Sequence, residues 1–248
     1  MAELEPNAVA VVTGAASGIG AATVLALARD GYRVACLDLD ARRAEETARK
    51  AGNGHIALGV DIGDERAVVA AFDEIAAKLG RIDALATCAG IADTTSFMDI
   101  PVETFRRVYE INVVGTFLCI REAARHMTRG GRICTVASVA GLRGGGLMGT
   151  AAYATSKGAV LALSRNAARA LAERGITVNC VAPGATETPM TAGAFGDDAK
   201  RRSIEAATAL GRVATPEELA EGIAWLLSPR ASYVDGETLV IDGGLMMR

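Results

Sequence analysis

The sequence predicts an α/β fold built on a doubly wound parallel sheet of about seven strands flanked by helices. Short apolar runs of four to seven residues alternate with longer stretches of helical periodicity. Several of these runs end in a polar or glycine-bearing turn, which is typical of the carboxyl ends of parallel strands. No linker, repeat or low-complexity segment divides the chain, so we expect one domain over residues 1–248.

Composition favours an ordinary globular protein. Half of the residues are hydrophobic and only 4% are aromatic, so the core must consist mainly of Ala, Val, Leu and Ile. The net charge of −3, with mixed signs, gives no reason to expect a nucleic-acid or membrane partner. No apolar run approaches the ~20 residues of a membrane-spanning helix. The acidic N-terminus lacks the features of a signal peptide, so we expect a cytoplasmic protein.

The cysteine and histidine residues give no sign of a disulfide framework or a metal site. The five cysteines are scattered, and four of them, Cys36, Cys119, Cys134 and Cys180, fall inside apolar runs. We expect buried free thiols in a reducing compartment. The two histidines have no neighbours at metal-ligand spacing, so no metal is predicted.

The first unit of the chain is a strand, a glycine turn, a helix and a second strand. The apolar run Ala8–Val12 precedes a turn with Gly14, Gly18 and Gly20, and Arg33–Asp38 follows the helix. Glycines let the backbone approach a pyrophosphate closely, and the helix N-terminus offers unpaired N–H groups to it. This unit therefore predicts a dinucleotide site, although the glycine spacing differs from the usual Gly-x-Gly-x-x-Gly.

Asp38, at the end of the second strand, predicts the type of dinucleotide. A carboxylate there can accept hydrogen bonds from the adenosine ribose diol, and it would repel a 2′-phosphate. Neither Ser17 nor Leu39 provides a cation for such a phosphate. We therefore expect NAD(H) rather than NADP(H), with a simple turn-capping role for Asp38 as the alternative.

Two arginines leave the opposite preference open. Arg42 and Arg43 lie a few residues after Asp38 and would permit NADP(H) if they reached a 2′-phosphate. The alternative is that they belong to the solvated face of a helix over Ala41–Lys50, whose mixture of Arg and Glu suits an exposed surface.

The middle of the chain continues the alternation of strands and helices. We expect strands and helices at His55–Val60, Glu65–Leu79, Ile82–Ala86, Pro101–Met127 and Ile133–Ala137, in that order. Asn112 lies in an apolar part of the long helix. A polar amide there is either a satisfied buried group or a functional one.

The stretch from Ser138 to Lys157 carries the predicted chemistry. Ser138 follows the fifth strand, and Tyr153 and Lys157 lie four residues apart in a helical pattern that continues through Ala170. On a helix they share one face and are about 6 Å apart along the axis. The ammonium would favour the phenolate and lower the Tyr153 pKa from its usual value of about 10. That predicts an acid/base role, although the spacing alone also fits an ordinary surface pair.

The last third of the chain completes the sheet. A sixth strand is predicted at Ile176–Ala182, and Pro183-Gly184 ends it. Ala185–Lys200 is rich in small residues, and we expect a mobile lid there. A helix with Thr215 as its cap runs to Leu227, and Thr238–Ile241 is the seventh strand.

Together these residues resemble the short-chain dehydrogenase/reductase family, of the classical single-domain type. The resemblance extends from Val9 to Gly244 and depends on the motifs Thr13-Gly14-x-x-x-Gly18-Ile19-Gly20, Asp61, Ala89-Gly90, Asn112, Ser138, Tyr153-x-x-x-Lys157 and Pro183-Gly184. It implies a Rossmann-type sheet that contains both cofactor and substrate sites. It also implies an oxidoreductase that transfers a hydride between NAD(H) and a secondary alcohol or ketone, and a homotetramer.

The resemblance implies four catalytic residues. Tyr153 would exchange a proton with the substrate oxygen as general acid/base. Lys157 would hold the nicotinamide ribose and lower the tyrosine pKa. Ser138 would orient the substrate oxygen, and the backbone at Asn112 would bind a water that links Lys157 to solvent.

The resemblance also implies the cofactor contacts. The pyrophosphate, ribose, adenine and nicotinamide contacts would come from Gly14, Ser17, Gly18, Ile19, Gly20, Asp38, Leu39, Asp61, Ile62, Cys88, Ala89, Gly90, Tyr153, Lys157, Pro183, Gly184, Thr186 and Thr188. One departure concerns the fourth strand end, where the family usually has Asn-Asn-Ala-Gly and this chain has Thr87-Cys88-Ala89-Gly90. The first asparagine commonly pins the central sheet, and we expect threonine to do so only in part.

The expected substrate contacts are Ser138, Leu147, Met148, Tyr153 and Met190. The surrounding loops are mostly apolar, which suits a small-molecule secondary alcohol or ketone of modest size. Arg143, the one cation of the loop before Tyr153, would face either solvent or an acidic substrate group.

Three other functions compete with an NAD-dependent alcohol dehydrogenase. The pattern also resembles a 3-oxoacyl-[acyl-carrier-protein] reductase, which would use NADPH, and Asp38 argues against it. A non-catalytic NAD-sensing regulator usually lacks a catalytic residue, whereas all four are present here. A methyltransferase would have a glycine turn but no need of Tyr-x-x-x-Lys.

Overall fold

The computed structural model describes residues 4–145 and 150–247, so the expected substrate contacts Leu147 and Met148 lie outside the described residues. The seven strands are β1 (Val9–Thr13), β2 (Arg33–Asp38), β3 (Ile56–Gly59), β4 (Ile82–Thr87), β5 (Met127–Val136), β6 (Thr177–Pro183) and β7 (Thr238–Ile241). They form one sheet in the order β3-β2-β1-β4-β5-β6-β7, and every neighbouring pair is parallel. This arrangement confirms the predicted fold class.

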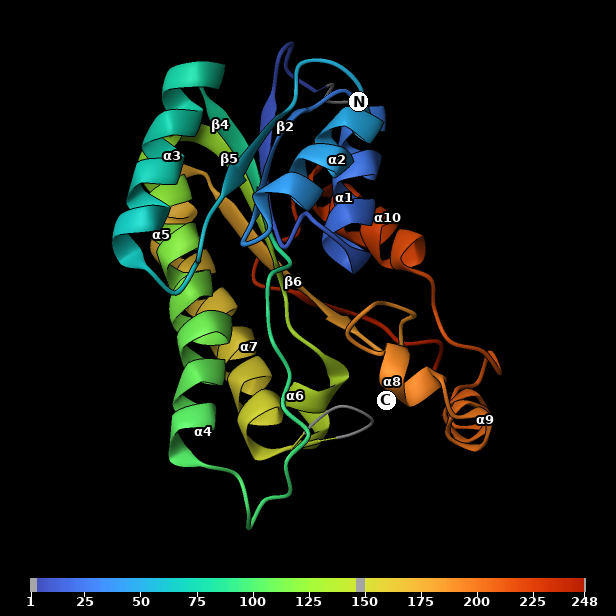
Figure 1. The fold of residues 1–248 in the computed structure, drawn as a ribbon. Coiled ribbons are helices and arrows are strands. Elements are labelled where there is room, and N and C mark those ends of the chain that lie inside the picture. The colour runs from blue at the N-terminus through green and yellow to red at the C-terminus, as the bar shows by residue number, and fades with distance from the viewer. Residues whose placement is uncertain (1–3, 146–149, 248) are drawn as a thin grey trace.

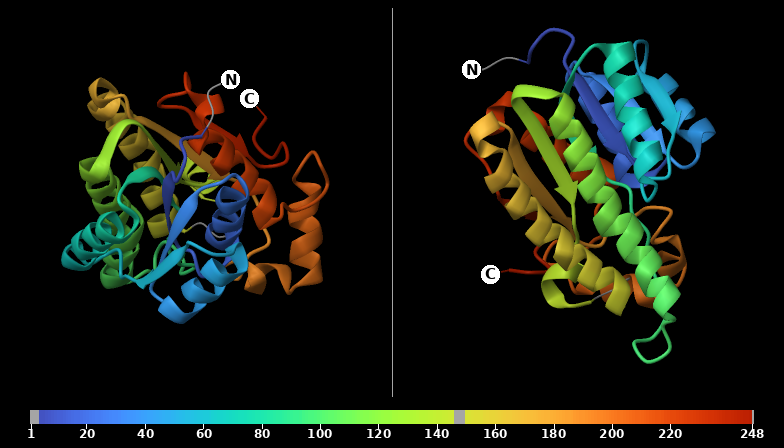
Figure 2. Two further views of the ribbon diagram at one scale, coloured as in Figure 1. Left: turned by 90° about the horizontal axis from the view of Figure 1, so that it is seen from above. Right: turned by 90° about the vertical axis from the view of Figure 1, so that its left-hand side faces the viewer.

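Helices cover both faces of the sheet (Figures 1 and 2). They are α1 (Gly18–Arg29), α2 (Ala41–Ala51), α3 (Glu65–Leu79), α4 (Val102–Tyr109), α5 (Thr116–His126), α6 (Val139–Arg143), α7 (Ala151–Leu171), α8 (Ala192–Phe195), α9 (Asp198–Ala206) and α10 (Pro216–Leu227). Helices α1, α2 and α10 pack on one face, and α3, α5 and α7 on the other (Figure 1). The order of strands reverses between β1 and β4, which is where an open α/β sheet forms a ligand-binding crevice.

Each face of the sheet buries its own apolar cluster. Successive side chains of a strand point to opposite faces, so the two alternating sets of β1 enter different clusters. Val9 and Val11 pack with α3 and α5, whereas Ala10 and Val12 pack with α1 and α10. All four side chains are fully buried, which explains why β1 has no polar residue before Thr13.

The long helix expected over Pro101–Met127 differs in the structure. A π-helical segment, Glu110–Gly115, joins α4 to α5, and Asn112 lies within it. The hydroxyl of Thr116 donates to the backbone oxygen of Asn112 at 2.8 Å. This side-chain bond competes with the regular helical bonds, and such π segments often mark functional sites.

Other boundaries also differ from the predictions. The bounds of β2, α3 and β7 are as predicted, but β5 begins at Met127 rather than Ile133. The segment expected to be a mobile lid is more regular than predicted, because it contains α8 and the start of α9. Asp197 caps α9 by accepting hydrogen bonds from the backbone N–H groups of Ala199 and Lys200.

The cysteines are unpaired in the structure, and most of them lie in its interior. All five cysteines are free, and Cys36, Cys119, Cys134 and Cys180 are buried. Within residues 4–145 and 150–247, no helix is long and apolar enough to cross a membrane. The same residues contain no group of three or more His, Cys, Asp or Glu side chains that would hold a metal ion.

Thr87 leaves the centre of the sheet incompletely bonded. Its hydroxyl is buried and has no hydrogen-bond partner among the described protein atoms. Thr135, its neighbour on β5, instead shares a 2.6 Å hydrogen bond with the Ser164 hydroxyl. The threonine therefore does not provide the sheet-pinning contact that the family's usual asparagine would give.

We expect Thr87→Val to raise the free energy of unfolding by about 1 kcal/mol, because it removes an unsatisfied buried hydroxyl without a change of shape. The matched variant Thr135→Val should lower it by ~1 kcal/mol, because the Ser164 hydroxyl keeps its bond to the Val160 backbone oxygen but loses its bond to Thr135. Urea unfolding of the three proteins measures both effects. Equal destabilisation by the two substitutions would show that the Thr87 hydroxyl is satisfied.

Candidate active site

The turn between β1 and α1 brings the backbone close to the crevice. Gly14 has a φ of +70°, and a Cβ atom there would lie 2.8 Å from the backbone nitrogen of Ala89. A Cβ atom on Gly20 would lie 2.1 Å from the backbone oxygen of Gly14. Ser17, the N-cap of α1, makes no side-chain hydrogen bond to the helix. The first N–H groups of α1 are therefore available to an anion.

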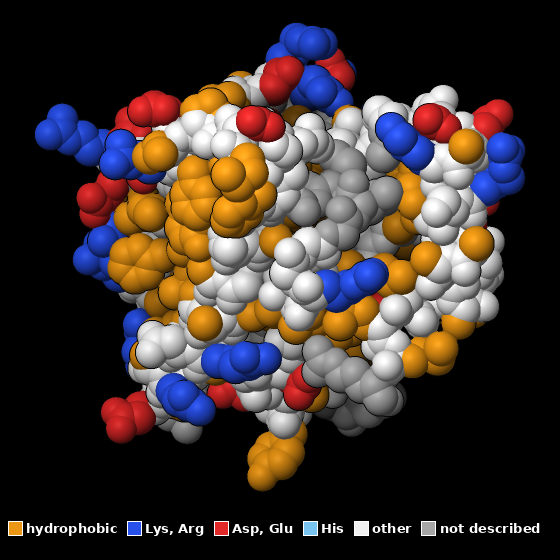
Figure 3. Space-filling model, turned by 90° about the horizontal axis from the view of Figure 1, so that it is seen from below, with side chains coloured by type: hydrophobic (Ala, Val, Ile, Leu, Met, Phe, Trp, Pro, Cys, Tyr) orange, Lys and Arg blue, Asp and Glu red, His pale blue; other side chains and the backbone are white. Residues whose placement is uncertain are grey.

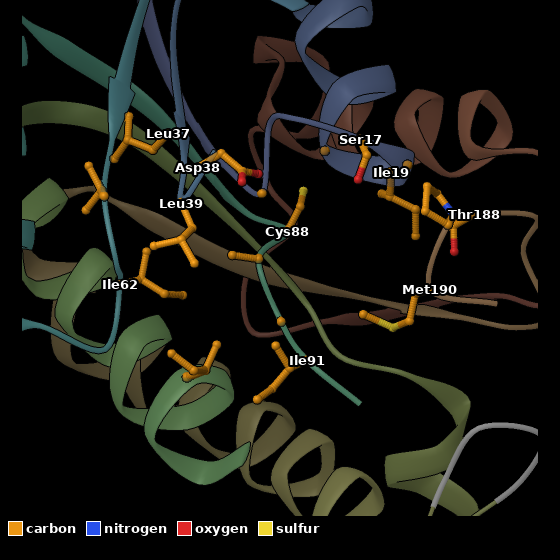
Figure 4. Close-up of a pocket in the computed structure, with 18 of the residues that line it drawn as sticks. Ser17, Ile19, Leu37, Asp38, Leu39, Ile62, Cys88, Ile91, Thr188 and Met190 are labelled. Atoms are coloured by element: carbon orange, nitrogen blue, oxygen red, sulfur yellow. The ribbon is translucent and has the colours of Figure 1, made fainter. Parts of the chain in front are cut away.

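A cavity of about 360 Å³ lies along the carboxyl ends of β1, β2 and β4 (Figure 4). Asp38 and Leu39 lie at one end, and Thr188 and Met190 at the other. The predicted cofactor residues that line it are Gly14, Ser17, Gly18, Ile19, Gly20, Asp38, Leu39, Asp61, Ile62, Cys88, Ala89, Gly90 and Thr188.

The carboxylate of Asp38 is held in place by backbone. It accepts hydrogen bonds from the N–H groups of Ala16 and Asp40, both at 3.0 Å. A carboxylate has about four acceptor positions, so two are left for a ligand. The neighbouring Leu39 is 74% exposed and carries no charge.

The two arginines after Asp38, Arg42 and Arg43, are not part of the cavity wall. Arg42 forms a 2.6 Å ion pair with Glu46, one turn later on α2. Neither Arg42 nor Arg43 lines the cavity. The backbone N–H of Arg43 donates to Asp40, which caps α2.

The one cation that lines the described part of this cavity is Arg107, which sequence reasoning missed. Its guanidinium lies 3.1 Å from the Asp61 carboxylate. A hydrogen bond from the Gly63 N–H and the pairing with Arg107 hold the Asp61 pKa below its usual range. No sequence signal links Arg107 to Asp61, because the contact arises from the packing of α4 beside the loop after β3.

A second cavity has a volume of about 330 Å³. Tyr153, Gly184 and Met190 line it, and Met190 lines both cavities. Tyr153 therefore faces a space that lies next to the first cavity.

Ser138 and Lys157 support Tyr153 from two sides. Ser138 is the N-cap of α6, accepts a hydrogen bond from the Ala140 N–H at 3.1 Å and is hydrogen-bonded to Tyr153. The Lys157 ammonium is buried, donates to the backbone oxygen of Val136 at 2.7 Å and lies 5.9 Å from the Tyr153 ring centre. The structure thus brings together three of the four predicted catalytic side chains.

The predicted direction of the Tyr153 pKa is wrong. Burial raises the pKa of this phenol, and the hydrogen bond with Ser138 offsets the rise only in part. Burial likewise lowers the pKa of Lys157 to about 8. The cause is desolvation, which disfavours the charged form of both groups and cannot be read from a four-residue spacing.

The side-chain amide of Asn112 makes three hydrogen bonds. Its amide exchanges two hydrogen bonds with the backbone of Ile91, at 2.8 and 2.9 Å, and donates a third to the Ser156 hydroxyl at 3.0 Å. It therefore ties the loop after β4 to the π-helical segment and to α7. A Cβ atom on Gly90 would lie 3.1 Å from the Asn112 amide oxygen and 3.4 Å from the Lys157 nitrogen.

Three of the predicted cofactor residues, Lys157, Pro183 and Thr186, line neither cavity. Pro183 is buried at the end of β6, and Thr186 is buried beside it. The hydroxyl of Thr186 donates to the backbone oxygen of Gly184 at 3.2 Å, so it is turned toward its own loop. In this structure the Thr186 hydroxyl bonds within its own loop, and the cofactor contacts of Pro183 and Thr186 stay predictions.

The chain is similar to known proteins over nearly its whole length. Residues 14–246 match the protein-family model described as Enoyl-(Acyl carrier protein) reductase. The chain is 43% identical over 250 residues to the cis-4-hydroxycyclohexanecarboxylate dehydrogenase of Sinomonas cyclohexanicum, with 98% of each chain covered. It is 36% identical over 241 residues to the 3-oxoacyl-[acyl-carrier-protein] reductase FabG of Escherichia coli (strain K12), with 96% of this chain and 97% of the relative covered.

A solved structure agrees with the curated relatives. The crystal structure of a dehydrogenase/reductase from Sinorhizobium meliloti 1021 superimposes with a TM-score of 0.92 at 36% identity, covering 99% of this chain and 97% of that chain. The sequence motifs, the fold and these relatives agree, and the chain belongs to the short-chain dehydrogenase/reductase family of oxidoreductases.

Proposed function

We propose that this protein is an NAD(H)-dependent dehydrogenase that interconverts a small secondary alcohol and its ketone. The observation that carries the proposal is that Met190 lines both the cavity that contains Asp38 and the cavity that contains Tyr153, so the two cavities are neighbours. A relative with 43% identity is named for the oxidation of a ring alcohol. That supports a substrate of the same general class.

The residues of the first cavity fit a bound NAD(H). The close approach at Gly14 and Gly20, and the uncapped N-terminus of α1, suit a pyrophosphate. The two open acceptor positions of Asp38 suit the ribose hydroxyls, and its charge disfavours a 2′-phosphate. When bound, the cofactor supplies the hydride acceptor or donor.

Within this proposal the chain's own residues handle the proton. Tyr153 removes the hydroxyl proton of the alcohol during oxidation and returns it to the ketone oxygen during reduction. Ser138 hydrogen-bonds the same oxygen and orients it. Lys157 stabilises the phenolate, and Asn112 fixes the loop that carries Gly90 against Lys157.

A 3-oxoacyl-[acyl-carrier-protein] reductase that uses NADPH is the second candidate. The 36% identity to the Escherichia coli reductase and the description of the matching family model favour it. The two candidates share the proton chemistry and differ in cofactor and substrate. Initial rates with both cofactors, against secondary alcohols and 3-oxoacyl thioesters, discriminate them.

We expect ketone reduction to lose rate as the pH rises through about 8, because Lys157, whose pKa burial lowers to about 8, then loses the charge that stabilises the phenolate. The value of kcat/KM should be level below that pH and fall toward tenfold per pH unit above it. Initial rates from pH 6 to 10 measure this. A profile that is level to pH 10, or that falls below pH 7, contradicts the assignment.

We also propose that the protein assembles as a homotetramer. Exposed apolar side chains support this on the long helical pair, at Val102 of α4, Val114 of the π-helical segment and Phe117 of α5. Val114 and Phe117 are three residues apart, and exposed apolar side chains of this kind are suited to pairing with a second copy of the chain.

A further inference from the structure

The cavity beside Tyr153 has a single charged side chain among its described lining residues, Arg143. Most of the other lining side chains are apolar, including Val139, Met190, Ile204 and Leu245. In the view of Figure 3, apolar side chains lie on the described surface beside the hollows of this face, and most of the charged side chains lie toward the rim. The described lining of this cavity therefore offers an anion one positive charge and no negative charge.

Arg143 has no partner of its own in the part of the chain that the structure describes. It makes no ion pair and donates no side-chain hydrogen bond there, and its side chain is exposed to the cavity mouth. Arg201, on the neighbouring helix α9, differs in this respect, because it pairs with both Glu187 and Glu205. The charge of Arg143 is thus free to pair with a ligand.

Arg143 is held by the short helix α6, which begins directly after Ser138 and packs closely on α7, the helix that carries Tyr153 and Lys157. Helix α6 begins after Ser138 and ends at Arg143. A Cβ atom on Gly141 would lie 2.6 Å from the backbone nitrogen of Gly158, so α6 is docked tightly on α7. Gly144, with a φ of +76°, then closes the helix by a 2.9 Å hydrogen bond to Ala140.

Helix α6 separates Arg143 from Ser138. The two residues are five positions apart, which is about 7.5 Å along the helix axis. This separation favours an acid several bonds away from the hydroxyl over an acid on the adjacent carbon. The single positive charge matches a carboxylate, which has a charge of −1, better than a phosphate, with about −2.

We propose that Arg143 is a specificity residue that binds a carboxylate on the substrate, remote from the carbon that is oxidised. The inference rests on the proposed alcohol dehydrogenase function and names its substrate class as hydroxy acids whose hydroxyl and carboxylate are separated by a ring or a comparable chain.

Equilibrium binding tests the subsite without turnover. Calorimetric titrations would compare cyclohexanecarboxylate with the neutral, similarly shaped cyclohexanecarboxamide and with cyclohexyl phosphate. We expect the carboxylate to bind the wild type about tenfold more tightly than the carboxamide, as for one charged hydrogen-bonded pair. That ratio should approach one in Arg143→Gln and be largely restored in Arg143→Lys.

The control variant is Arg202→Gln, which removes an exposed arginine of α9 that does not line the cavity. Its carboxylate-to-carboxamide ratio should equal that of the wild type. Equal binding of the two probes to the wild type, no binding of either, a ratio that survives in Arg143→Gln, or tighter binding of the phosphate would each overturn the carboxylate subsite.

Turnover separates this inference from the function on which it rests. Oxidation of cyclohexanol and of 4-hydroxycyclohexanecarboxylate by NAD⁺ at equal kcat/KM would keep the dehydrogenase and overturn the subsite. Carboxylate binding that depends on Arg143, without oxidation of any alcohol, would keep the subsite and overturn the proposed dehydrogenase. A carboxylate preference of about tenfold in kcat/KM that falls in Arg143→Gln supports both.

Discussion

Replacement of Tyr153 by phenylalanine is expected to lower kcat about 10³-fold for both alcohol oxidation and ketone reduction. The substitution removes only the phenol oxygen, which is the atom that exchanges a proton with the substrate. The ring, its packing and the contact of Lys157 with Val136 all remain. The dissociation constant for NADH should therefore change less than about threefold, or ~0.7 kcal/mol.

The matched control is Tyr233→Phe, because the side chain of Tyr233 is fully exposed and lines neither cavity. It should keep the wild-type kcat. Steady-state rates and a fluorescence titration with NADH give both quantities for each variant. A Tyr153→Phe enzyme with wild-type rates would exclude this phenol as the acid/base group.

The double substitution Asp38→Ala with Leu39→Arg should lower the preference for NAD⁺ over NADP⁺ by about 10²-fold or more. The first change removes a carboxylate that would repel the 2′-phosphate, and the second adds a guanidinium able to pair with it. At roughly 1.5 kcal/mol for each effect, the sum is ~3 kcal/mol. The ratio of the two kcat/KM values is the quantity to measure, since it cancels any general loss of stability.

The neighbouring Asp40 provides the charge control. Asp40→Asn removes one negative charge two residues away, while its side-chain oxygen still caps α2 through the N–H of Arg43. Its cofactor preference should stay within about threefold of the wild type, because screening weakens exposed charges that do not touch the ligand. An equal shift in the Asp40 variant and the double variant would mean that net charge, and not Asp38, sets the preference.

Much of the fold was predictable because local patterns determine it. The alternation of β1 between two buried clusters and the apolar period of α3 need no information beyond their own residues. The placement of Asp38 at the cavity also followed from the strand–turn–helix–strand order, since the carboxyl ends of parallel strands meet at one edge.

What was missed depends on contacts between distant parts of the chain. Arg107 reaches Asp61 only because α4 packs beside the loop after β3. The rise in the Tyr153 pKa reflects the desolvation of its phenol by surrounding atoms, which a helical spacing does not reveal. The π-helical segment around Asn112 lies inside a stretch with ordinary helical periodicity, so hydrophobic periodicity does not reveal it.

The central claim is that the protein oxidises a secondary alcohol with NAD⁺. In this account NAD⁺ binds in the cavity that contains Asp38, and Tyr153 accepts the proton of the alcohol. The most direct test is the initial rate of absorbance increase at the reduced-nicotinamide band, with equal concentrations of NAD⁺ or NADP⁺ and a panel of secondary alcohols. The account predicts reduction of NAD⁺ in preference to NADP⁺ with at least one of these alcohols, and loss of that rate in Tyr153→Phe. No reduction of NAD⁺ with any alcohol, together with oxidation of NADPH by a 3-oxoacyl thioester, would contradict it.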